Sequence, residues 1–93
     1  MVGRQLRFEA HVEVRSLDGI ADPAGLTIER ALPALGFEGV EQVRVGKVIT
    51  FSVEAPDEEA AQATVAALCD RLLANPVIEQ AEFRLRAQTA AGA

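Results

Sequence analysis

The sequence predicts an α+β fold, a ferredoxin-like or split βαβ antiparallel sheet with two helices on one face. Three observations predict it. Strand-like and helix-like segments follow one another in the order β-α-β-β-α-β, the helical segments carry apolar stripes, and 93 residues suffice for one modest core. We expect residues 1–86 to form this single domain. Residues 87–93 show no pattern, and we expect a disordered tail there.

Residues 6–14 predict the first strand, because apolar and polar side chains alternate there without a break. The apolar face holds Leu6, Phe8, Ala10, Val12 and Val14, and the polar face holds Arg7, Glu9, His11, Glu13 and Arg15. The run is about twice as long as an ordinary strand. We therefore expect it to reach beyond its own sheet and to pair with a second subunit.

The first helix is predicted to begin at Asp22-Pro23, since Asp caps free amides and Pro suits the first helical position. Its apolar stripe consists of Ala24, Ile28, Ala31, Leu32 and Leu35. Pro33 removes a helical amide, which predicts a bend or a distorted last turn. Gly36 is expected to end the helix.

Two strands are predicted next, residues 42–45 and residues 49–53, joined near Gly46-Lys47. The second helix begins at Pro56-Asp57, where the acidic residues suit the helix dipole, and it stops at Asn75-Pro76. Residues 77–86 form the last strand. The phenylalanines Phe8, Phe51 and Phe83 are all expected on the helix-covered side of the sheet.

Composition excludes several classes of function. The net charge is −5, which disfavours nucleic-acid binding because that affinity comes mainly from cations that meet phosphates. Four Phe without Trp or Tyr leave little for base stacking. The first residues lack the apolar stretch of a signal peptide, so we expect none, and no apolar run is long enough to span a membrane. A single cysteine fits a reducing compartment, so we expect a cytoplasmic protein.

No residue cluster predicts an active site or a metal site. The one histidine, His11, is placed on the polar strand face, where a solvent or interface role is expected. Cys69 lies on the apolar helix face and is expected to be an inert core thiol. Gly46-Lys47 does not fit a phosphate-binding loop, because Glu41 and Val48 stand where that motif needs Gly and Ser or Thr. Arg84 and Arg86 predict a solvated face or a partner contact.

Four segments, in order and with matching spacing, resemble the PurS family. They are Asp22-Pro23-Ala24-Gly25, Glu29-Arg30-Ala31-Leu32-Pro33-Ala34-Leu35-Gly36-Phe37, Val43-Arg44-Val45-Gly46-Lys47 and Leu72-Leu73-Ala74-Asn75-Pro76-Val77-Ile78-Glu79. The resemblance runs from Leu6 to Leu85. PurS is the small subunit of bacterial and archaeal phosphoribosylformylglycinamidine (FGAM) synthase.

The resemblance implies a non-catalytic subunit of purine biosynthesis. It would bridge the glutaminase subunit PurQ and the synthetase subunit PurL, assist ammonia transfer between them, and form a dimer or tetramer. This chain would bind no cofactor, since ATP and magnesium belong to the synthetase. We also expect a homodimer in which the edges of the strands at 6–14 and 49–53 extend the sheet between identical subunits.

Arg44, Gly46 and Lys47 are the candidate partner interface, because they form a basic turn on an acidic protein and belong to one of these motifs. Two alternatives share the predicted fold. One is an ACT-like regulatory module that binds a small molecule, and the other is a plain structural interaction domain.

Overall fold

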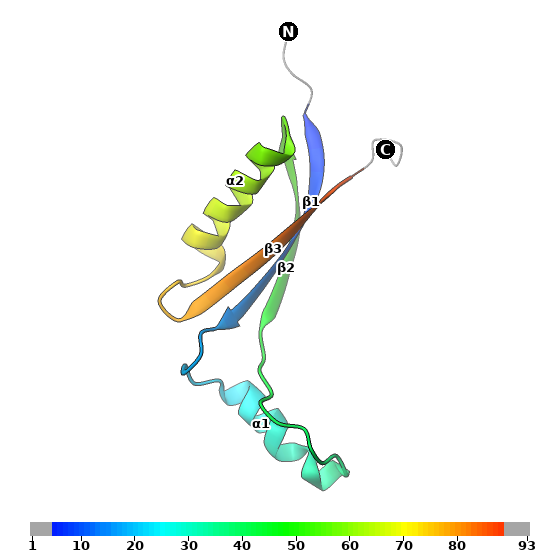
Figure 1. Ribbon diagram of the computed structural model, residues 1–93, viewed down its shortest axis with the longest axis vertical. Coiled ribbons are helices and arrows are strands. Elements are labelled where there is room, and N and C mark those ends of the chain that lie inside the picture. The colour runs from blue at the N-terminus through cyan, green and yellow to red at the C-terminus, as the bar shows by residue number, and fades with distance from the viewer. Residues whose placement is uncertain (1–4, 89–93) are drawn as a thin grey trace.

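The computed structural model describes residues 5–88 and contains a three-stranded antiparallel sheet (Figure 1). Its strands are β1 (Leu6–Ser16), β2 (Lys47–Ala55) and β3 (Glu79–Ala87), in the order β2-β1-β3. The register places His11 opposite Thr50 of β2 and opposite Arg84 of β3. Because β1 is the central strand, its expected free edge is absent, and the outer edges belong to β2 and β3.

One helix, α2 (Glu58–Leu68), covers the apolar face of the sheet (Figure 1). The Asp57 side chain caps it by accepting a hydrogen bond from the Ala60 amide at 2.8 Å. A π-helical turn, Cys69–Leu73, follows. The core beneath α2 consists of Phe8, Ala10, Val12, Val14, Val53, Ala55, Ala61, Val65 and Cys69. Phe51 and Phe83 pack against this core, so all three strand phenylalanines lie on the predicted side.

The other helix, α1 (Pro23–Ala31), begins at the predicted cap, and a 3-10 turn, Pro33–Leu35, follows it. Pro33 has no amide to continue the α-helical ladder, so the predicted distortion is confirmed at that residue. Gly36 ends the segment in the left-handed region, with φ of 90°.

The position of α1 differs from the prediction. The sequence predicted both helices on one face of the sheet, but α1 lies beyond the sheet, past the end of β1 and the start of β2 (Figure 1). The radius of gyration is 18.1 Å, whereas a compact chain of this length has about 12 Å. An amphipathic stripe shows that a helix face will be covered, but it does not show what covers it.

The strand predicted at residues 42–45 does not form. Gln42 has φ of 59°, which is incompatible with a strand, and the amides of Val43 and Val45 are bound by side chains instead of by a neighbouring strand. The α+β class and the antiparallel sheet with two helices are confirmed, and one of the four predicted strands is an irregular segment.

The last strand begins two residues later and ends one residue later than predicted. Ala87 ends β3, and the Gln88 amide donates to the Arg7 carbonyl at 2.8 Å, so residues 87 and 88 are not a tail. Residues 89–93, the rest of the expected tail, lie outside the described residues.

Candidate functional site

Arg44 ties α1 and the segment after it to the end of β1. Its guanidinium lies 3.6 Å from the Asp22 carboxylate and 4.0 Å from that of Asp18. It also donates to the carbonyls of Ser16 and Leu17 at 3.2 and 3.4 Å. These four contacts connect three segments that are up to 28 residues apart in the sequence. Arg44 therefore has a structural role within its own chain.

Asp22 uses both carboxylate oxygens. One accepts from the Gly25 amide at 3.1 Å, as the cap prediction required, and the other accepts from the Val45 amide at 2.8 Å. These two amides, with Arg44 nearby, lower the pKa of Asp22 below its ordinary value. Glu29 also binds the segment that follows α1, because its carboxylate accepts a hydrogen bond from the Val43 amide at 3.0 Å.

Two glycines allow close approaches that another residue would block. A Cβ on Gly25 would collide with the Val43 carbonyl oxygen and the Asp22 carboxylate. A Cβ on Gly46 would lie 2.6 Å from the Val14 carbonyl oxygen of β1. Residues 17–46 are here called the helical arm. Asp22 and Gly25 hold parts of the arm together, whereas Arg44, through the Ser16 carbonyl, and Gly46, against Val14, join the arm to the sheet.

The three candidate interface residues meet at the junction of the arm and the sheet. Arg44 and Gly46 face their own chain, whereas Lys47 starts β2 and is exposed. The contacts of Arg44 within the chain were not predicted, because nothing in the sequence pairs it with Asp18 or Asp22. The expectation that these three residues contact a partner subunit stays a prediction.

The helical arm exposes an unusual amount of apolar surface. Its exposed large apolar residues are Leu26, Ile28, Leu35, Phe37, Val40 and Val45. Leu35 is 69% exposed and Phe37 is 57% exposed. On the helix-covered face of the sheet, apolar residues on the outer strands are only partly buried: Ile49, Phe51, Ala81, Phe83 and Leu85. Both surfaces lack the cover that a second helix would provide in a closed two-helix layer.

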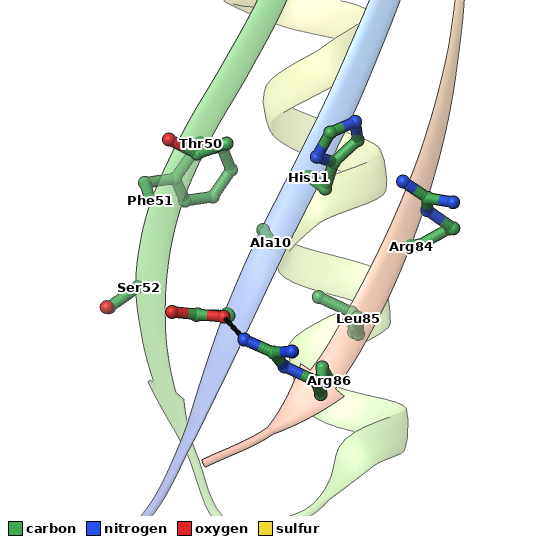
Figure 2. Close-up of a pocket in the computed structure, with 9 residues that line it drawn as sticks. Ala10, His11, Thr50, Phe51, Ser52, Arg84, Leu85 and Arg86 are labelled. Carbon is green, nitrogen blue, oxygen red and sulfur yellow. Dashed lines mark hydrogen bonds and ion pairs between the residues drawn. The ribbon is translucent and has the colours of Figure 1, made fainter.

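The opposite sheet face is open and polar (Figure 2). A shallow hollow of about 700 Å³ lies over it, and its polar lining residues are Glu9, His11, Thr50, Ser52, Arg84 and Arg86. Arg86 pairs with Glu9 and lowers the pKa of that carboxyl, with a further contribution from Gln88. Nε2 of His11 lies 3.4 Å from the Glu13 carboxylate. The predicted placement of His11 and Arg84 on this face is confirmed.

Cys69 is buried against the core, and burial together with the charge of Asp70 raises the pKa of its thiol. A raised pKa keeps the sulfur protonated, in accord with the predicted inert thiol. Within residues 5–88 no group of three or more His, Cys, Asp or Glu side chains could hold a metal ion. No helix in that part of the chain has the length and apolar character needed to cross a bilayer.

Comparison with known proteins gives a consistent result. The family model described as "PurS: Phosphoribosylformylglycinamidine (FGAM) synthase" matches residues 9–87. The PurS subunit from Synechocystis sp. is 41% identical over 80 residues, which cover 86% of this chain and 80% of the relative. The PurS subunit from Methanocaldococcus jannaschii is 38% identical over 78 residues, which cover 84% and 94%.

Solved structures agree. Thermus thermophilus PurS is 36% identical and has a TM-score of 0.79, with 89% of this chain and 99% of the other covered. A chain of the PurLQS structure from Thermotoga maritima is 36% identical with a TM-score of 0.75, covering 88% and 98%.

Residues 5–88 define a small α+β domain that leaves one helix and one sheet face without cover from their own chain. The chain belongs to the PurS family of FGAM synthase subunits. The resemblance seen in the four sequence segments is thereby confirmed, and the ACT-like and purely structural alternatives are disfavoured. Three of these segments supply residues that build the arm and its anchor, namely Asp22, Gly25, Glu29, Arg44 and Gly46.

Proposed function

We propose that this chain is the accessory subunit of an FGAM synthase, which converts formylglycinamide ribonucleotide, glutamine and ATP to the amidine. It bridges a PurQ glutaminase and a PurL synthetase and assists the transfer of ammonia between them. The single observation that carries this proposal is the apolar surface that this member of the PurS family leaves uncovered by its own chain. ATP and magnesium are expected on the synthetase, and no cofactor on this chain.

A bridging role has a clear physical benefit. Ammonia released into solvent is diluted and protonated before it reaches the second active site. A subunit that holds the two enzymes together raises the effective concentration of ammonia at the synthetase. The expected effect is on glutamine-dependent synthesis alone, because added ammonium salt needs no transfer.

Reconstitution with the two partner subunits tests this role. Amidine formation is assayed with glutamine and, separately, with ammonium salt, in the presence and absence of this chain. Loss of only the glutamine-dependent rate on omission of the chain is the expected result. If both rates are unchanged without it, the proposal is wrong. The reaction belongs to primary metabolism, so we expect the complex in the cytoplasm.

We further propose that the chain functions as a homodimer or tetramer, in which the helical arm of one copy covers apolar surface of another. Support comes from the exposed stripe on α1 and from the partly buried apolar residues on the helix-covered face of the sheet. The outer edges of β2 and β3 also remain free for sheet extension. A monomer at micromolar concentration in sedimentation velocity would contradict this proposal.

The junction residues Arg44, Gly46 and Lys47 are proposed as one contact with a partner subunit. Lys47 is the residue to test, because it is exposed and its side chain has no ion pair among residues 5–88. Lys47→Ala is expected to weaken assembly of the complex without altering the fold. Unchanged assembly and unchanged glutamine-dependent synthesis would remove Lys47 from the interface.

A further inference from the structure

One row of side chains crosses the centre of the open sheet face. Thr50 of β2, His11 of β1 and Arg84 of β3 are direct neighbours in the register, and they lie on the face opposite α2 (Figure 2). Each can donate a hydrogen bond away from the sheet: a hydroxyl, an imidazole N–H and a planar guanidinium. The hollow of about 700 Å³ lies directly above this row.

Arg84 differs from the other arginines of the sheet. Arg7 lies 3.6 Å from Glu54, Arg15 lies 3.4 Å from Glu82, and Arg86 pairs with Glu9. Within residues 5–88 no carboxylate lies within 4.0 Å of the Arg84 guanidinium.

The neighbour of Arg84 on β1 is His11, whose imidazole adds a further N–H donor to the row. Two carboxylates border the row: Glu13 lies 3.4 Å from His11, and Glu82 lies 3.4 Å from Arg15. Arg84 is therefore the permanent charge of this row, and it has no ion pair within residues 5–88 of a chain whose net charge is −5. Its missing counterpart is an anion.

We propose that the row formed by Thr50, His11 and Arg84 receives the carboxylate of an Asp or Glu side chain from another subunit of the synthase complex. A guanidinium binds a carboxylate through two parallel hydrogen bonds, and the hydroxyl and imidazole can donate to the remaining lone pairs. This inference rests on the proposed bridging function, and it names the face and the chemistry through which one partner binds.

The exposure of the row favours a protein over a small molecule. Thr50 and Arg84 are both exposed. A solvent-exposed ion pair contributes only about 0–1 kcal/mol, too little to hold a free amino acid without enclosing walls. The same ion pair contributes more binding free energy when the surrounding surface excludes water, as happens at the centre of a subunit interface.

Symmetry disfavours a second copy of this chain as the occupant. A twofold axis through the row would bring two copies of Arg84 against each other, and like charges at close range are unfavourable. The occupant is instead a different subunit that presents an acidic side chain.

Charge reversal at Arg84 tests the inference. Full-length Arg84→Glu is mixed with the PurL-type and PurQ-type subunits of the same organism, and the dissociation constant is measured at two salt concentrations. We expect Arg84→Glu to raise the dissociation constant about tenfold or more. Arg84→Lys keeps the charge but cannot form two parallel hydrogen bonds, so its dissociation constant should lie between those of the wild type and Arg84→Glu. The matched control is Arg71→Glu, which makes the same charge change at an exposed position on the α2 side.

The outcomes are distinct. Wild-type affinity in Arg84→Glu, or an equal loss in Arg71→Glu, overturns the inference and leaves the bridging function standing. A change in self-association of Arg84→Glu without the partners overturns it too, because the face would then bind a second copy. So does binding of free glutamine or glutamate to the wild-type chain that Arg84→Glu abolishes. Failure of the wild-type chain to bind either subunit rejects the bridging function itself, and the inference with it.

Discussion

At the scale of single residues, Gly25 shows how a missing Cβ positions the helical arm. Gly25 lies in the first turn of α1, where Ala would ordinarily stabilise a helix by about 1 kcal/mol. Here a Cβ would meet the Val43 carbonyl, which is backbone and has little freedom to move. Whether Gly25→Ala raises or lowers the free energy of unfolding therefore tests the contact between α1 and Val43.

We predict that Gly25→Ala lowers the free energy of unfolding by about 1–3 kcal/mol, since the clash outweighs the gain in helix propensity. Urea unfolding followed by circular dichroism measures the change. Ala63→Gly at an exposed position of α2 calibrates ordinary helix propensity and should cost about 1 kcal/mol. Stabilisation by Gly25→Ala would mean that α1 and residue 43 do not touch.

Asp22 makes the internal packing of the helical arm dependent on pH. Its pKa is lowered in the folded chain by the amides of Val45 and Gly25, so the charged form is the one that stabilises. This contribution is fully present above the ordinary Asp pKa of 3.8 and is lost as the pH falls through the lower folded value.

We therefore expect Asp22→Asn to be less stable than the wild type at pH 6. The gap should narrow steadily below pH 3.8, where the wild-type carboxyl also becomes neutral. Thermal unfolding across this range gives the comparison. A gap that does not depend on pH would assign the effect to the shape of the side chain and not to its charge.

The sequence predicted half of what Asp22 does. Its role as a helix cap followed from Asp22-Pro23, because a cap is a local feature. Its second hydrogen bond, to the amide of Val45, joins residues 23 positions apart and has no local signature. Arg44 was missed for the same reason, and its place in a basic turn made it look like a free surface cation.

At the scale of the elements, α2 and the π-helical turn that follows it should respond very differently to substitution. Val65 is fully buried against the sheet, and Leu72, one turn past the end of α2, is 74% exposed. We predict a loss of about 2–3 kcal/mol for Val65→Ala, from two buried carbon groups and the cavity they leave. Leu72→Ala should stay within about 0.5 kcal/mol in the isolated chain. Denaturant midpoints of the two variants decide the matter.

The elements with alternating apolar and polar residues or with a helix cap were predicted well, whereas the segments held by residues distant in the sequence were not. β1, α2 and β3 follow directly from periodicity and from Asp57. The segment at 42–45 alternates like a strand, yet Asp22 and Glu29 take the amides that a strand would offer to a neighbour. Alternation is a pattern of side chains, so it cannot show that other side chains will bind the backbone amides of this segment.

At the scale of the whole molecule, the arm should control self-association. Ile28 lies on the predicted apolar stripe of α1 and is 46% exposed. We predict that Ile28→Asp weakens the homodimer roughly a hundredfold or more, because each dimer loses two buried isoleucines. Sedimentation velocity over a concentration series measures the change.

Thr64→Asp, which places the same acid on an exposed position of α2, is the control for Ile28→Asp and should leave the dimer intact. Equal behaviour of the two variants would place the interface elsewhere, with the free edges of β2 and β3 as the next surfaces to examine.

The strand order has a consequence for how the chain folds during synthesis. The central strand, β1, is made first, but one of its neighbours, β3, is made last, and the pair Phe8–Ala87 closes a loop of nearly the whole chain. Contacts this distant in sequence form slowly, and they require that β3 has left the ribosome. The arm, held by contacts over shorter distances, can be complete before then. In a newly made chain the helical arm will therefore fold before the sheet is complete. Until β3 pairs with it, the apolar face of β1 will need rapid release of the chain, or a chaperone, to avoid aggregation.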